Sequence, residues 1–108
     1  DFTQVVTAGE KAAQAAAALQ ARLTATIDRH VEDMAQERGY NSAARLAGYA
    51  TSTVTGWQAE AQAFVAWRDQ VWLAAFAILA DVQNGARAVP TEAELVAELP
   101  VMVWPDNN

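Results

Sequence analysis

The chain has 108 residues, of which 53% are apolar, and this supports one small domain with a single hydrophobic core. The formal net charge is −6 and the seven basic residues lie singly along the sequence, which argues against a nucleic-acid partner, since phosphate binding needs clustered Lys and Arg. Cysteine is absent, which excludes disulfides, thiolate metal sites and cysteine nucleophiles.

The first predicted element is a long helix that covers residues 1–38. Thr7 and Glu10 have the spacing of a capping box, although the helix could also begin one turn earlier, at Thr3. No proline interrupts the chain up to Arg38, and Gly39 then supplies the left-handed residue that commonly ends a helix. About 30 helical residues correspond to roughly 45 Å, which is long for a domain of this size.

The two halves of this helix differ in character. Residues 8–21 are mostly alanine, which favours helix but buries little area. Apolar residues then recur in steps of four, four, four and three, which disfavours a leucine zipper: Leu19, Leu23, Ile27, Val31 and Met34. We expect this half to pack on the third helix and the alanine-rich half to project and bind copies of itself, which predicts a homo-oligomer with Leu19 and Leu23 among its contacts. The alternative is a helix that is simply exposed.

His30 is the single histidine, and it shares one helix face with Asp33 and Glu37. Such a face could hold a divalent metal, but the same residues also fit a solvated charged surface with local ion pairs, which we favour. A third interpretation places Thr26 and His30 in polar layers between the helices of an oligomer. No serine lies in a nucleophile motif, so we expect no enzyme, no cofactor and no metal.

A short second helix, capped by Asn41 or Ser42, is predicted to end near Ala50. Residues 51–55 then form a polar loop.

The third helix is predicted to run from a capping box at Thr55–Gln58 to Asn84, with Gly85 ending it. It holds three of the four tryptophans, and we expect it to supply most of the core: Phe64, Trp67, Arg68, Val71, Trp72, Phe76 and Leu79. Arg68 is predicted to be a structural anchor that lies along Trp67 or Trp72 and pairs with a carboxylate or with the carbonyls at a helix end. The alternative makes Arg68 and Asp69 a recognition site for another chain. The uncharged run from Val71 to Ala80 is too short to cross a bilayer, so we expect a soluble protein with no membrane partner.

A fourth short helix is predicted from the capping box at Thr91 and Glu94 to a point before Pro100. The following residues are too apolar to lie in solvent, so Val101, Val103 and Trp104 either fold back over the helices or bind a partner. Only this segment reads, weakly, as a strand. The predicted fold is therefore all-α: a long N-terminal helix (1–38), a compact helical domain (39–100) and an extended tail (101–108).

A series of short motifs runs in order from the end of the first helix to the tail: Arg38-Gly39-Tyr40-Asn41-Ser42, Tyr49-Ala50, Gln58-Ala59-Glu60-Ala61, Phe64-Val65-Ala66-Trp67-Arg68-Asp69, Trp72, Leu79-Ala80-Asp81-Val82-Gln83, Pro90-Thr91 and Glu98-Leu99-Pro100. In this series the chain resembles small proteins encoded in the tail regions of bacteriophages and prophages. The resemblance covers about two thirds of the chain, from His30 to Pro100.

The resemblance implies where the protein works, in or on a phage tail, and it implies no catalytic residue. It predicts a tail-associated structural or assembly protein that binds a tail or tail-fibre protein, in the host cytoplasm during assembly or in the virion tail. Two alternatives are an assembly chaperone absent from the finished particle and a prophage-encoded regulator of a host protein.

Overall fold

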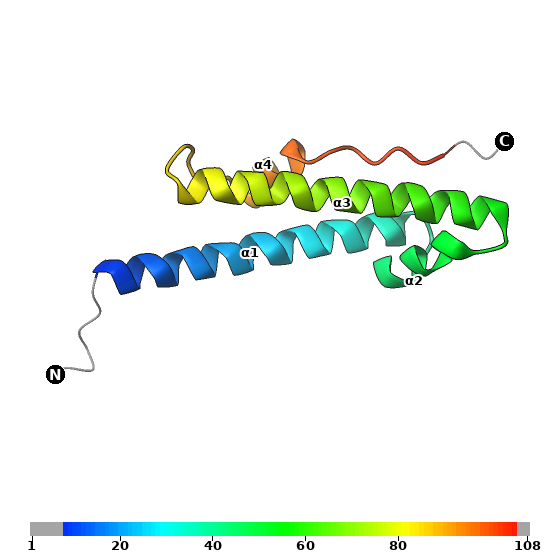
Figure 1. Ribbon diagram of the computed structural model, residues 1–108, viewed down its shortest axis with the longest axis horizontal. Coiled ribbons are helices and arrows are strands. Elements are labelled where there is room, and N and C mark those ends of the chain that lie inside the picture. Colours follow the sequence, from blue (N-terminus) through cyan, green and yellow to red (C-terminus); the bar gives the residue numbers. More distant parts are fainter. Residues whose placement is uncertain (1–7, 106–108) are drawn as a thin grey trace.

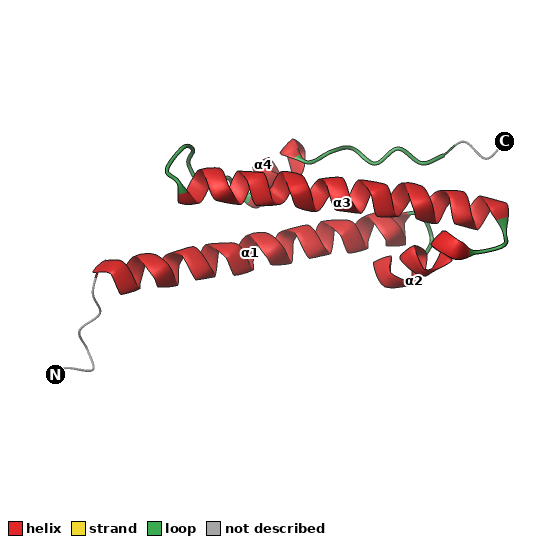
Figure 2. Cartoon of the chain, in the orientation of Figure 1, coloured by secondary structure: helices red, strands yellow, loops and turns green. Residues whose placement is uncertain are grey.

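A computed structural model describes residues 8–105, and every regular element in that range is a helix (Figure 2). In chain order these are α1 (Ala8–Glu37), α2 (Ala43–Ala47), the 3-10 helix η2 (Gly48–Thr51), α3 (Thr55–Gln83) and α4 (Glu92–Glu98). The predicted all-α fold with a long N-terminal helix is confirmed. The weak strand signal at residues 101–104 is wrong, because this segment is extended but pairs with no other strand in the described chain.

The two long helices lie side by side and antiparallel, and the short elements cover them (Figure 1). α2 and η2 lie at the end where α1 connects to α3, while α4 packs on one side of the helix pair and the tail runs back along α3. The molecule measures 66 × 28 × 19 Å, and its radius of gyration is 18.1 Å. A compact domain of this length would have a radius near 13 Å, so the protein is elongated.

Most of the helices begin or end near the glycine and capping residues that the sequence predicted. α1 ends at Glu37, and Gly39 just after it has a φ of 102°, which lets the amide of Tyr40 reach the carbonyl of Ala35 at 3.1 Å. Gly85, with φ of 75°, follows α3 in the same way. The predicted box at Thr7 lies outside the described residues.

The two short helices are capped by side chains. At α4, the hydroxyl of Thr91 accepts from the amide of Glu94 at 3.1 Å, and the Glu94 carboxylate accepts from the amide of Thr91 at 2.9 Å, which confirms the predicted capping box. At α2, Ser42 accepts from the amide of Arg45 at 3.0 Å, and Glu32 of α1 accepts from the amide of Ala43.

The predicted capping box at the start of α3 is wrong. The helix already includes Thr55, so Val54 takes the N-cap position, and it has no side chain that could accept a hydrogen bond. The first turn closes through the backbone alone, with the amide of Gln58 bonded to the carbonyl of Val54 at 2.9 Å.

One core runs along the seam between α1 and α3. α1 contributes the predicted stripe, with Leu23, Ile27 and Val31 buried, and the shorter helices close the seam with single side chains. The buried apolar residues are Leu23, Ile27, Val31, Ala35, Leu46, Ala61, Phe64, Trp67, Val71, Ala75, Ile78, Leu95 and Leu99.

The predicted core of α3 needs two corrections. The face of α3 that meets α1 holds the buried residues Phe64, Trp67 and Val71. Beside it lie the partly buried residues Trp72 and Leu79. Phe76, in contrast, is 56% exposed, since it lies about 100° around the helix from buried Ala75. Arg68 is also outside the core and pairs with its neighbour Asp69 at 3.2 Å.

α3 as a whole is long and apolar enough to cross a membrane by length and composition, which the shorter run from Val71 to Ala80 did not indicate. The central helix of a folded helical domain has the same properties, and α3 occupies that position here.

The phenylalanines of α3 provide a matched test of this fold. Phe64 is fully buried, so Phe64→Ala should lower the unfolding free energy by about 3 to 5 kcal/mol through lost burial and a cavity. Phe76→Ala, the same change at an exposed position, should cost less than about 1 kcal/mol. Urea denaturation followed by circular dichroism measures both. Equal losses for the two variants would contradict the assigned face of α3.

Candidate functional site

The one buried charged side chain of the described residues is Glu60, in the second turn of α3, with 9% of its surface exposed. Its carboxylate Oε2 accepts from Nε of Arg38 at 2.6 Å and also from the terminal Nη2 of the same guanidinium. Its Oε1 accepts from the hydroxyl of Tyr40 at 2.7 Å. Both carboxylate oxygens are therefore occupied, by residues on either side of the Gly39 turn.

These contacts set the ionisation of the group. Burial alone would raise the pKa of Glu60, but the hydrogen bonds from Tyr40 and Arg38 and the charge of Arg38 outweigh it, so the pKa is lowered. Burial and the neighbouring carboxylate raise the pKa of Tyr40 to about 12. Glu60 is thus a structural group that is ionised at neutral pH, and both of its oxygens accept hydrogen bonds.

The C-terminal segment lies against this cluster. The Trp104 ring stacks on Phe64, with centroids 6.3 Å apart and an interplanar angle of 4°, and the Arg38 guanidinium lies 5.0 Å from the Trp104 ring. Nε1 of Trp67 donates to the carbonyl of Pro100 at 2.8 Å. Trp104 therefore folds back over the helices, as the first predicted alternative states. Val101 and Val103 do not, since they are 84% and 79% exposed, and their binding to a partner stays a prediction.

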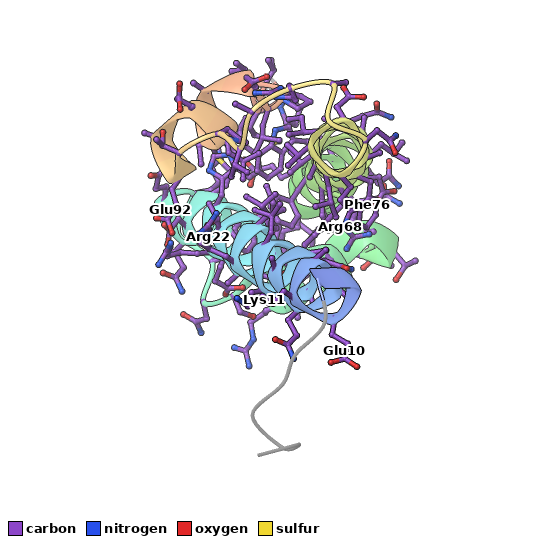
Figure 3. The ribbon with its side chains drawn as sticks, turned by 90° about the vertical axis from the view of Figure 1, so that its left-hand side faces the viewer. Glu10, Lys11, Arg22, Arg68, Phe76 and Glu92 are labelled. Atoms are coloured by element: carbon purple, nitrogen blue, oxygen red, sulfur yellow. The ribbon has the colours of Figure 1, made fainter. Side chains whose placement is uncertain are left out.

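A second surface lies on the side of the α1–α3 pair that faces away from α4. Figure 3 places Phe76 and Arg68 on the side of α1 and α3 away from Glu92 of α4. Phe76 packs on the partly buried Trp72 with ring centroids 5.8 Å apart, and Leu73 is exposed beside them. We call Trp72, Leu73 and Phe76 the α3 apolar surface. The pocket between the α3 apolar surface and α1 has a volume of only about 10 Å³. This surface therefore suits contact with another protein better than binding of a small molecule.

Thr26 and His30 of α1, which one interpretation placed between the helices of an oligomer, make contacts within this chain. The hydroxyl of Thr26 donates to the carbonyl of Arg22 at 3.0 Å and is buried, which is a correction to its expected place in a contact between copies. His30 lies edge-on to Trp67 with ring centroids 5.5 Å apart. Both line an open groove of about 500 Å³ between α1 and α4, beside the Arg29–Glu92 ion pair.

Within residues 8–105, no three His, Asp or Glu side chains lie close enough to hold a metal ion, and His30, Asp33 and Glu37 therefore form no such group.

The alanine-rich half of α1 extends past the end of α3 (Figure 1). Leu23 is buried against α3 and Leu19 is partly buried, so Leu23 is corrected from a contact residue to a core residue, because the stripe turns towards α3. The exposed residues of this arm include the alanines Ala13, Ala17 and Ala21, together with the polar side chains Glu10, Lys11, Gln14 and Gln20.

The Glu60 cluster is the feature that sequence reasoning missed. A single charge in an otherwise uncharged helix turn was the available signal, and its partner Arg38 reads equally well as a charge that caps the end of α1.

Comparison of the sequence with profiles of known protein families, with curated proteins and with solved structures finds no match.

The ionised state of Glu60 predicts a specific pH dependence. Because its folded pKa is lowered, Glu60 contributes stability that is present above about pH 4.3, the ordinary glutamate pKa, and is lost as the pH falls through the lower folded value. Glu60→Gln should therefore reduce the unfolding free energy by about 1 to 3 kcal/mol at pH 7.

The measurement is urea denaturation of both proteins from pH 7 to pH 3, with the exposed Glu37→Gln as the control. The difference between wild type and Glu60→Gln should shrink at the acid end. A difference that stays constant over this range would show that the charge of Glu60 is not what stabilises the fold.

Proposed function

We propose that the protein is a non-enzymatic structural or assembly accessory of a phage or prophage tail, and that it acts through protein–protein contacts. The observation that carries this proposal is the apolar surface left open on the helix pair. Trp72, Leu73 and Phe76 form a contiguous cluster with two exposed members, on a side that α4 leaves uncovered. Exposed apolar surfaces of this kind mark binding sites for other proteins.

The setting comes from the resemblance of residues 30–100 to phage tail-region proteins. An elongated helical body suits a protein that bridges other components, since it offers them long flanks. The proposed partner is a tail or tail-fibre protein, met in the host cytoplasm during assembly or retained in the virion tail.

The proposal includes a homo-oligomer formed through the alanine-rich arm of α1. This helix face carries the small side chains of Ala13, Ala17 and Ala21, which permit the close approach of a second helix. Ala17→Glu changes an exposed position and should leave the monomer folded, but it places a charge in such a contact.

The experiment is deletion of the gene from the phage or prophage that carries it, with complementation by variants. Wild type should restore particles and be found in them by mass spectrometry. Leu73→Ser/Phe76→Ser, altered only at exposed positions, should fold normally but fail to restore assembly.

The other outcomes separate the alternatives. Loss of fibres on deletion, with no protein in wild-type particles, favours the assembly chaperone. Normal particles without the protein would contradict any role in the tail and favour the regulator of a host protein. A double serine variant that complements fully would show that the α3 apolar surface is not the contact.

A further inference from the structure

The loop that joins α3 to α4 begins with Asn84 followed by Gly85, and two such residues can react with each other. The backbone nitrogen of the residue after an asparagine can attack the side-chain carbonyl carbon, and glycine crowds this nitrogen least because it has no side chain. Both residues are exposed. Apart from its chain neighbours, no atom of the described chain lies within 4 Å of the place where a Cβ of Gly85 would sit, so water has access.

In the folded protein this turn is closed. Gly85 has a φ of 75°, and its amide donates to the carbonyl of Val82 at 3.1 Å. The amide of Ala86 donates to the carbonyl of Asp81 at 2.8 Å. These are the two hydrogen bonds of a Schellman motif at the end of α3. The nitrogen that would have to attack is therefore engaged in the helix end.

The backbone angle at Asn84 also holds the reacting groups apart. Its ψ is 0°, which places the nitrogen of Gly85 in line with the nitrogen of Asn84 itself and away from Cβ, the carbon that carries the side-chain amide. A five-membered ring through Cβ and Cγ needs rotation about this bond, and that rotation breaks the hydrogen bonds of the motif. Helix ends open locally at a lower free energy than global unfolding, so the folded protein reaches this state.

We propose that Asn84 is a site of spontaneous deamidation, gated by the opening of the turn at the end of α3. The nitrogen of Gly85 loses its proton and bonds to Cγ of Asn84, while the bond from Cγ to Nδ2 breaks and Nδ2 leaves as ammonia with that proton. Water then opens the succinimide ring at either of its carbonyl carbons, which leaves aspartate or isoaspartate at position 84. Water is the only co-reactant, and the site is independent of the proposed tail function.

The products fit the closed turn less well than asparagine does. Both place a negative charge at the C-terminal end of α3, where the helix dipole is already negative and the last turn holds no basic residue. The guanidinium of Arg87, three residues on, already donates to both carboxylate oxygens of Glu98 at 2.7 Å. Isoaspartate also adds a carbon to the backbone inside the motif. The modified turn should therefore stay open.

An open turn affects the attachment of α4. The loop after Gly85 carries Arg87, which binds Glu98 at the end of α4, and the buried Pro90, which precedes the N-cap Thr91. The Schellman motif sets the direction in which this loop leaves α3. Its loss should loosen the loop and α4 while leaving the distant α2 end unchanged.

The first test is incubation of the full chain in mildly alkaline water enriched in heavy oxygen, then digestion with trypsin in ordinary water and mass spectrometry. Cleavage after Arg68 and Arg87 gives residues 69–87, in which Asn84 is the single asparagine. Residues 39–45 hold the exposed Asn41, followed by Ser42, as the internal control. Fragment 69–87 should gain heavy oxygen with time, and Asn84→Gln, whose longer side chain disfavours ring closure, should prevent this gain.

The gate predicts the effect of unfolding. In urea that unfolds the chain, Asn84 should be modified about tenfold faster or more, because the turn no longer has to open. Three results would overturn the proposal: no heavy oxygen in fragment 69–87, modification of Asn41 as fast as that of Asn84 in unfolded chain, or equal rates at Asn84 with and without urea.

The second test concerns the consequence for α4. Anion-exchange chromatography separates the modified chain through its extra negative charge, and hydrogen exchange followed by mass spectrometry compares it with the unmodified chain. Amide exchange should be faster in residues 85–99 and unchanged in α2, which lies at the other end of the helix pair (Figure 1). Equal exchange of residues 85–99 in the two forms would contradict the loosening of α4.

Discussion

The buried carboxylate of Glu60 is the constraint on which the rest of the structure depends. An ionised side chain inside an apolar helix pair is costly unless hydrogen bonds and an opposite charge meet it, and Arg38 and Tyr40 supply both. These two residues flank Gly39, so the interaction ties the turn after α1 to the second turn of α3. Arg38 also lies 5.0 Å from the Trp104 ring, so the same cluster contacts the C-terminal segment.

A pair of antiparallel helices leaves much of its surface open to solvent. The short helices of this chain cover some sides of the α1–α3 pair and leave others exposed. α4 covers one side of the seam with Leu95, followed by Leu99 at its C-cap, and α2 covers one end with Leu46. Leu73 and Phe76 stay exposed, and Figure 3 shows Phe76 on the side away from α4. The elongated body thus combines a stable seam with apolar surface left for partners, which is why contact rather than chemistry is its proposed mode of action.

Much of this fold was predictable because its signals are local. Gly39 and the Thr91–Glu94 box act within one turn, and the leucine stripe of α1 reports a single buried face. α3 was harder: it is apolar around most of its circumference, so periodicity could not separate buried Ala75 from exposed Phe76. The pairing of Arg38 and Glu60 joins residues 22 positions apart, and the contact of Trp104 with Phe64 joins residues still further apart in the chain. Neither has a local signature in the sequence.

The central claim is that the Tyr40 hydroxyl donates to a buried, ionised Glu60, and the titration of Tyr40 tests it most directly. The chain has two tyrosines, so the Tyr49→Phe variant isolates Tyr40 for ultraviolet absorbance titration of the phenol. Burial and the adjacent carboxylate predict a pKa of about 12 for Tyr40 in the folded protein. A value near 10, the ordinary tyrosine pKa, measured while circular dichroism still reports a folded helix pair, would contradict the cluster.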